Sequence, residues 1–248
     1  MLSTQRIISL VPSLTELLFE LGLDKEVVGR TKFCVYPADR INDIPIVGGT
    51  KTVHHDRIEA LQPTLILANK EENTKSDVET LQTRFNVLLT NVVTMSDALN
   101  MIMTVGKAVD RITEAWQLTA KISESLAGLP PLPGPKRAAY LIWQDPWMVA
   151  GNQTFIDTML AVAGFSNVFG HQSRYPVVSP ADLQAVKPDL IFLSSEPYPF
   201  RETHKAPLQA LCPNAQIRLV DGAVFSWYGS RLLQAADYFK TVIRPAFA

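Results

Sequence analysis

Hydrophobic residues along this chain gather into short runs that alternate with amphipathic stretches. Runs of this length are too short for helices and are typical of buried strands; in the N-terminal part they lie at Arg6–Val11, Val27–Gly29, Ile66–Ala68 and Val87–Leu89. Between them, apolar residues recur at helical spacing around Leu14–Leu21, Arg57–Leu61 and Ser76–Arg84. Short strands alternating with helices favour α/β units around a mainly parallel sheet. The pattern therefore predicts an α/β lobe from about Arg6 to Val93.

The same pattern occurs again in the C-terminal half. Ile58–Glu71 and Leu183–Glu196 each contain a short helical tail, a proline, an apolar run and a glutamate eight residues after that proline. The helices expected before them, Leu14–Gly22 and Phe155–Gly164, both stop at a glycine. The repeat is too long to be a solenoid unit. We therefore expect two similar α/β lobes with a ligand cleft between them.

The stretch that joins the lobes has a helical pattern. Ser96–Leu126 contains no proline and a single glycine, Gly106, and its apolar residues form one stripe: Ile102, Val105, Val109, Ile112 and Trp116. We expect one long α-helix of about thirty residues, roughly 45 Å long, with Trp116 in the core. Two shorter helices broken near Gly106 are the alternative. The expected domains are an N-terminal lobe (1–95), a connecting helix (96–128) and a C-terminal lobe (129–248).

Composition narrows the function. The formal net charge is −1, with 47% hydrophobic and 19% charged residues, which gives no reason to expect nucleic acid or an anionic membrane as partner. No apolar run approaches the roughly 18–20 residues of a membrane span, so contact with a membrane would be peripheral. Cys34 and Cys212 show no metal-binding spacing and are expected to be isolated thiols. The N-terminus lacks a signal-peptide pattern, which indicates the cytoplasm if Met1 is native.

Motifs for catalysis are scarce. The sequence contains no nucleophile elbow and no phosphate-binding loop. His54 and His55 beside Asp56 could contribute to a zinc or manganese site, although a polar loop is the simpler interpretation. Aromatic residues form a better signal, because ligands of α/β sheets bind at loops that leave the carboxyl ends of strands. Three such clusters occur: Trp143 with Trp147, Tyr198 with Phe200, and Trp227 with Tyr228.

Several motifs in order resemble a known family. They are the segments 7–16, 27–37, 47–51, 67–73, 193–200 and 220–232, which include Ser-Leu-Val-Pro-Ser-Leu-Thr-Glu and Phe-Ser-Trp-Tyr-Gly-Ser-Arg-Leu. The chain resembles, over nearly its whole length, the cobalamin and iron-siderophore substrate-binding proteins of ABC importers, which are class III receptors with a helical backbone.

The resemblance implies a monomeric, non-enzymatic receptor, periplasmic or extracytoplasmic, that binds a cobalamin-like corrinoid or related metal chelate as its ligand and has no intrinsic cofactor. It implies that rim glutamates, Glu71 (or Glu72) and Glu196, dock on arginines of the ABC permease. The expected ligand contacts are Phe33, Tyr36, Asn69, Trp143, Trp147, Tyr198, Phe200, Trp227 and Tyr228. A free zinc or manganese receptor using His54 and His55, and a chelatase-like enzyme using a histidine and a glutamate, are the alternatives.

Overall fold

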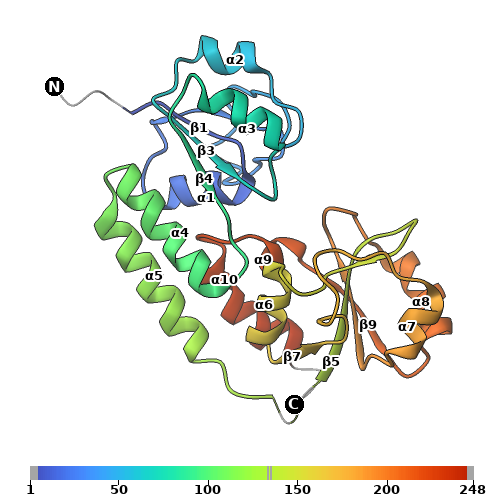
Figure 1. The fold of residues 1–248 in the computed structure, drawn as a ribbon. Helices are drawn as coiled ribbons and strands as arrows, with labels where there is room; N and C mark the ends of the chain where they lie inside the picture. Colours follow the sequence, from blue (N-terminus) through green and yellow to red (C-terminus); the bar gives the residue numbers. More distant parts are fainter. Residues whose placement is uncertain (1–4, 133, 135, 245–248) are drawn as a thin grey trace. The chain divides into compact units, whose positions relative to one another are not determined.

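The computed structural model describes residues 5–132, 134 and 136–244, and the chain forms two compact units (Figure 1). Unit 1 holds the chain up to Val92, together with Ser96–Ile122 and Tyr228–Arg231. Unit 2 holds Val93–Met95, Ser123–Trp227 and the chain from Leu232 onward. Each unit contains its own mostly parallel sheet, so the predicted two-lobe α/β fold is confirmed.

Unit 1 is built on a parallel sheet of four strands in the order β2-β1-β3-β4. These strands are β1 (Ile7–Ser9), β2 (Val27–Arg30), β3 (Leu65–Asn69) and β4 (Val87–Thr90), and the helices that accompany them are α1 (Pro12–Glu20), α2 (His55–Ala60) and α3 (Lys75–Gln82). Helix α1 begins with Pro12, whose missing N–H is not needed in a first turn. The chain after it turns at Gly22 with a φ of 75°, a conformation that glycine adopts without strain.

Unit 2 is built on a sheet of five strands in which β5 pairs with β6, β7 and β8, and β8 pairs with β9. Only β6 runs antiparallel to its neighbour. The strands are β5 (Lys136–Trp143), β6 (Met148–Val149), β7 (Phe165–Asn167), β8 (Leu190–Ser194) and β9 (Gln216–Val220). The helices are α6 (Phe155–Val162), α7 (Pro180–Ala185), α8 (Lys205–Leu211), α9 (Gly222–Ser226) and α10 (Leu232–Tyr238), with a 3₁₀ turn at Glu202–His204 and a π turn at Phe239–Ile243.

Side-chain caps set several helix starts in unit 2. The Thr154 side chain accepts a hydrogen bond from the backbone N–H of Asp157 and starts α6. Ser179 and Asp182 form a reciprocal capping box at the start of α7. Such caps satisfy backbone donors that have no partner inside the helix. These local contacts explain why unit 2 can use short helices to connect its strands.

The single long helix predicted between the lobes is wrong, and the alternative of two helices is correct. Helix α4 spans Met95–Ala108 and helix α5 spans Ile112–Ala127. Between them Asp110 has a φ of 55°, which lies outside the helical region. Gly106 permits the return of the chain, because a Cβ there would lie 2.3 Å from the Cβ of Ala115. The two helices therefore lie side by side, as Figure 1 shows.

The break also explains why the apolar stripe does not stay in the core. Val105 and Val109, before the break, are buried, whereas Ile112 and Trp116, after it, are 52% and 62% exposed. A stripe stays on one face only while the helix continues. The placement of Trp116 in the core is therefore wrong.

The sequence repeat is matched by equivalent contacts inside the two units. In unit 1, Arg6 donates from Nε and Nη2 to the carbonyl of Leu61, at 3.0 and 2.7 Å. Its backbone N–H donates to Thr64 Oγ1 at 2.9 Å, and its carbonyl accepts from the Thr64 N–H at 2.8 Å. Gln62, the residue before the proline, has a φ of 44°. These contacts attach the end of α2 to the beginning of β1.

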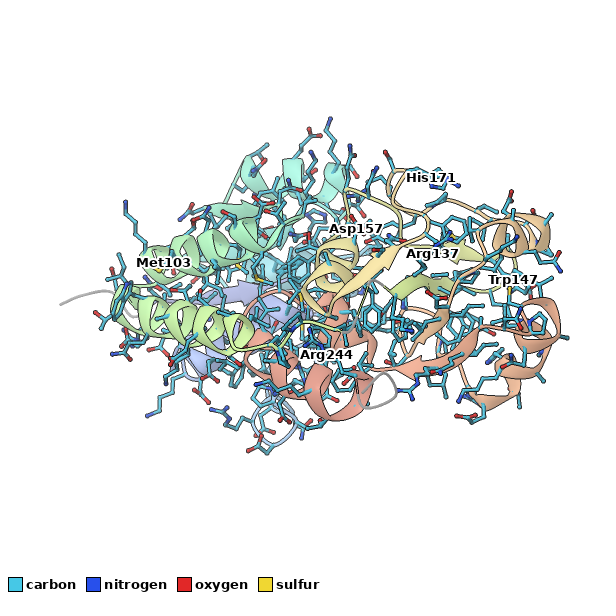
Figure 2. All side chains as sticks on the ribbon, turned by 90° about the horizontal axis from the view of Figure 1, so that it is seen from below. Met103, Arg137, Trp147, Asp157, His171 and Arg244 are labelled. Carbon is cyan, nitrogen blue, oxygen red and sulfur yellow. The ribbon has the colours of Figure 1, made fainter. Side chains whose placement is uncertain are left out.

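Unit 2 repeats these contacts with different side chains. Arg137, labelled in Figure 2, donates from Nη2 to the carbonyl of Val186 at 2.6 Å. Its backbone N–H donates to Asp189 Oδ2 at 2.8 Å, and its carbonyl accepts from the Asp189 N–H at 2.8 Å. Lys187 has the same φ of 44° as its counterpart in unit 1. The duplication is therefore present in backbone conformation and hydrogen bonding.

A buried arginine joins three segments of unit 2 that are distant in sequence. Arg244, also labelled in Figure 2, is 8% exposed and donates to the carbonyls of Ala163, Val162 and Pro130. Two of these carbonyls lie at the C-terminal end of α6, where a positive charge is favourable. Burial lowers the pKa of Arg244. The contacts attach Pro130, which follows α5, and the π turn before Arg244 to the C-terminal end of α6.

Candidate functional site

The loops that leave β5 and β8 in unit 2 bring several aromatic rings together. Trp143 is the last residue of β5, and its ring lies 5.6 Å from that of Tyr198, edge to face. Tyr198 lies 4.8 Å from Phe200, and its hydroxyl is 3.3 Å from His204 Nε2. We call Trp143, Tyr198, Phe200 and His204 the aromatic cluster. Trp143 is its exposed member at 40%, while Phe200 is buried.

The ring contacts of the cluster fix the orientation of Trp143. Edge-to-face contacts favour one relative orientation of two rings. An exposed ring in such a group therefore keeps its face accessible to solvent instead of folding back onto the protein surface. The predicted contacts Trp143, Tyr198 and Phe200 thus lie together. Trp147 lies on the α7–α8 side of unit 2 (Figure 2), where it packs against the core and its carbonyl accepts from the N–H of Val178 at 2.9 Å. Its ligand contact stays a prediction.

In unit 1 the exposed aromatics follow β2. Phe33 and Tyr36 are 50% and 43% exposed, and Val35 between them is 48% exposed. Large apolar side chains exposed so close together usually mark a binding surface. The Lys32 ammonium lies 5.1 Å from the Phe33 ring centroid, and the Arg231 guanidinium lies 4.7 Å from the Tyr36 ring centroid. This loop therefore combines exposed rings with positive charge.

Arg231 reaches this loop from the far end of the sequence. It belongs to Tyr228–Arg231, which is part of unit 1. Its Nε donates to Glu16 Oε2 at 3.1 Å and its Nη2 lies 2.7 Å from Glu16 Oε1, so the two side chains form a close ion pair. The two side chains are only 10% and 16% exposed. Both residues lie in the family-like motifs, but no role was predicted for them, because 215 positions separate them in sequence.

The glutamate of unit 1 lies in a loop that Asn69 stabilises. Asn69 is 1% exposed, and its Oδ1 accepts from the backbone N–H of Glu71 at 2.8 Å and of Glu72 at 3.4 Å. Its Nδ2 donates to the carbonyl and the hydroxyl of Thr90. Lys51 Nζ donates to the carbonyl of Glu71 at 2.6 Å. The described contacts of Asn69 are those of a loop support, and its predicted ligand contact is untested.

The glutamate of unit 2 occupies the equivalent loop, and its carboxylate accepts hydrogen bonds from side chains of the same unit. Glu196 Oε1 accepts from Trp227 Nε1 at 2.7 Å and from Ser226 Oγ at 2.8 Å. Ser194 Oγ donates to the carbonyl of Glu196 at 2.5 Å and is 3.1 Å from the hydroxyl of Tyr140. Burial raises the pKa of Tyr140, and the nearby carboxylate of Glu196 also raises it. Glu196 is therefore half-buried within a polar network.

The remaining predicted ligand contacts are buried. Trp227 is 9% exposed and Tyr228 is 5% exposed. Trp227 is the last residue of its stretch of unit 2, and Tyr228 is the first residue of the short segment that belongs to unit 1. Their contact with a ligand stays a prediction.

Three of the four histidines contact other protein groups. His55 Nε2 lies 3.1 Å from Asp77 Oδ1, in the first turn of α3. His171 stacks beside Phe169, and His204 Nδ1 lies 2.8 Å from the backbone N–H of Arg201, which donates to it. Within residues 5–132, 134 and 136–244, no group of three His, Cys, Asp or Glu side chains could hold a metal ion. Cys34 and Cys212 are buried free thiols, and burial raises the pKa of each.

Comparison with known proteins identifies the class. The family model described as "Periplasmic binding protein" matches residues 7–212. The vitamin B12-binding protein of Vibrio parahaemolyticus is 24% identical over 196 residues, which are 77% of this chain and 70% of that protein. Among the described residues, no helix combines the length and apolar character that crossing a membrane requires.

Solved structures agree on the fold. The apo periplasmic heme-binding protein RhuT from Roseiflexus sp. RS-1 has a TM-score of 0.83 at 22% identity, with 96% of this chain and 97% of that chain covered. The periplasmic vitamin B12-binding protein BtuF of Vibrio cholerae has a TM-score of 0.78 at 21% identity, with 98% and 97% covered.

This chain belongs to the periplasmic binding protein family. Members of that family are extracytoplasmic substrate-binding proteins. The resemblance to ABC-importer receptors that the motifs indicate is thereby confirmed.

Proposed function

We propose that this protein captures a corrinoid or a related flat metal chelate through the aromatic loops at the carboxyl ends of its strands, and delivers it unchanged to an ABC permease. The observation that carries the proposal is the presence of exposed rings on these loops in each unit: Phe33 and Tyr36 after β2, and Trp143 at the end of β5. A large chelate offers apolar faces to such rings and polar edges to nearby cations. Relatives named for vitamin B12 and heme support the class of ligand.

Calorimetry with cyanocobalamin, cobinamide, hemin and a ferric hydroxamate tests the proposal. At least one should bind with a Kd below roughly 10 μM, which corresponds to about −7 kcal/mol. The bound compound should be recovered chemically unchanged by mass spectrometry. If none of the four binds at this level, a chelate receptor is the wrong function.

Two tryptophans provide a matched pair of variants. Trp143 is 40% exposed in the aromatic cluster, whereas Trp116 is 62% exposed and belongs to helix α5, not to a strand-end loop. Trp143→Ala should weaken binding at least about tenfold, the scale of truncating an aromatic residue at a binding centre. Trp116→Ala should leave affinity unchanged. Equal effects of the two substitutions would contradict the assignment of the site.

The proposal includes docking of a monomer on the permease through Glu71 or Glu72 in unit 1 and Glu196 in unit 2. Equivalent loops present these glutamates, and acidic side chains suit arginines on a partner. Glu71→Arg and Glu196→Arg should each impair uptake of the chelate in cells that depend on this protein. The double variant should impair it more. Wild-type uptake by the double variant would remove the docking role.

A further inference from the structure

The contacts of Glu196 assign it a second task. Its Oε1 atom accepts two hydrogen bonds, from the indole of Trp227 at 2.7 Å and from the hydroxyl of Ser226 at 2.8 Å. The indole N–H of tryptophan can only donate a hydrogen bond, and an ionised carboxylate can only accept one. A hydrogen bond to an ionised carboxylate is shorter and about twice as strong as one between neutral groups. This hydrogen bond therefore helps to fix the orientation of the Trp227 ring.

The surrounding backbone is shaped to let the carboxylate reach the indole. A Cβ on Gly222, the first residue of α9, would lie 2.5 Å from Glu196 Cγ and 2.5 Å from Ser194 Oγ. Any larger residue would push the glutamate side chain away from α9. The Gly222 N–H also donates to Ser195 Oγ at 2.9 Å. Glycine at this position allows the β8 loop and α9 to pack closely enough for the bond.

Trp227 lies at a special point of the chain. It is the last residue of the Ser123–Trp227 stretch of unit 2, and the next four residues, Tyr228–Arg231, belong to unit 1. Its backbone N–H donates to the carbonyl of Ala223 at 2.9 Å, so its main chain is attached to α9. The bond from its side chain to Glu196 thus attaches the crossover to the β8 loop.

We infer that Glu196 is a positioning residue for Trp227, so that the acid expected to dock on the permease also holds the residue at which the chain passes from unit 2 to unit 1. The docking part of this inference rests on the proposed function. An arginine fork binds carboxylates through both oxygens, and one of these already accepts from Trp227. Engagement by a permease arginine therefore competes with the indole and loosens the crossover segment.

The indole N–H signals of ¹⁵N-labelled protein test the positioning role without chelate or permease. The chain has four tryptophans, and Trp227→Phe identifies the signal of interest. In Glu196→Ala, the Trp227 N–H should exchange with water about tenfold faster or more, the effect expected for losing a hydrogen bond to a charged group. Glu196→Gln keeps an acceptor oxygen and should give an intermediate rate. The Trp143 signal is the internal reference and should not change.

Glu71→Ala is the matched control, since this glutamate occupies the equivalent loop of unit 1. It should leave the Trp227 signal unchanged. Unaltered exchange of Trp227 in Glu196→Ala would overturn the inference, and if that variant does not fold, unaltered exchange in Glu196→Gln would do so. If Trp227 responds as expected but both alanine variants support wild-type uptake, docking by these acids fails and the positioning role stands.

Discussion

The ion pair between Glu16 and Arg231 should be the most consequential one that the described residues of unit 1 contain. Its Nε–Oε2 and Nη2–Oε1 distances are 3.1 and 2.7 Å, and the side chains are 10% and 16% exposed. Removing one partner of a buried pair leaves an uncompensated charge and costs about 3–5 kcal/mol. Because these side chains keep some contact with water, we expect Glu16→Met or Arg231→Met to cost about 2–3 kcal/mol each.

The double variant distinguishes pairing from simple loss of packing. Glu16→Met/Arg231→Met leaves no charge unpaired and retains apolar bulk at both positions. Buried pairs replaced by apolar residues often lose little stability. The double variant should therefore cost about 2 kcal/mol less than the sum of the single variants, which is a coupling typical of directly contacting residues.

Urea unfolding provides the measurement. With a slope of about 1–3 kcal/mol per molar urea, each single substitution should lower the midpoint by roughly 1 M. The exposed pair of Glu59 and Arg84, also in unit 1 and about half exposed, is the control, and its coupling should be clearly smaller because water screens the two charges. A coupling for Glu16 and Arg231 no larger than that of the control would refute the reasoning.

Three further predictions concern stability. Burial raises the pKa of Tyr140 above the value near 10 of the unfolded phenol, so its contribution to folding stability is complete below pH 10 and is lost as pH rises above it. Tyr140→Phe should therefore reduce the fall of the urea midpoint at alkaline pH. An unchanged fall would contradict this. Arg244→Ala removes a cation from three backbone carbonyls and should cost about 3 kcal/mol, with only partial recovery in Arg244→Lys; thermal unfolding at wild-type temperature would disprove it. Gly106→Ala places a Cβ 2.3 Å from that of Ala115 and should cost about 1–3 kcal/mol by overpacking in urea unfolding, whereas Gly128→Ala, with its nearest atom at 3.5 Å, should cost nothing.

Local patterns were enough to predict the four strands of unit 1 and the repeat. The apolar run Ile66–Ala68 lies inside β3, and the run that follows Pro188 forms β8. Strand formation here depends on burial of a short contiguous segment, which the sequence displays directly. The α/β class follows from the same information.

Tertiary contacts decided what the sequence could not. The apolar spacing from Ile102 to Trp116 continues across the break between α4 and α5. The residue with positive φ at this break is Asp110, not a glycine or proline that would have indicated the turn. The turn depends on the close approach of Gly106 to Ala115, which has no signature in the periodicity. The ion pair of Arg231 with Glu16 likewise joins motifs that are distant in sequence, and neither motif indicates that its charged residue pairs with the other.

The two glutamate loops show what the duplication has kept and what it has changed. In each unit a polar side chain at the end of an inner strand accepts from the glutamate's backbone N–H: Asn69 from Glu71 at 2.8 Å, and Ser194 from Glu196 at 3.4 Å. An amide and a hydroxyl are chemically different groups, yet both orient the same backbone position. The side-chain surroundings have diverged: Glu196 Oε1 accepts hydrogen bonds from Trp227 and Ser226. This combination is expected if both glutamates contact related positions on a partner, because docking requires a similar backbone placement of the two acids. The additional hydrogen bond to Trp227 is expected if Glu196 also positions the residue at which the chain passes from unit 2 to unit 1.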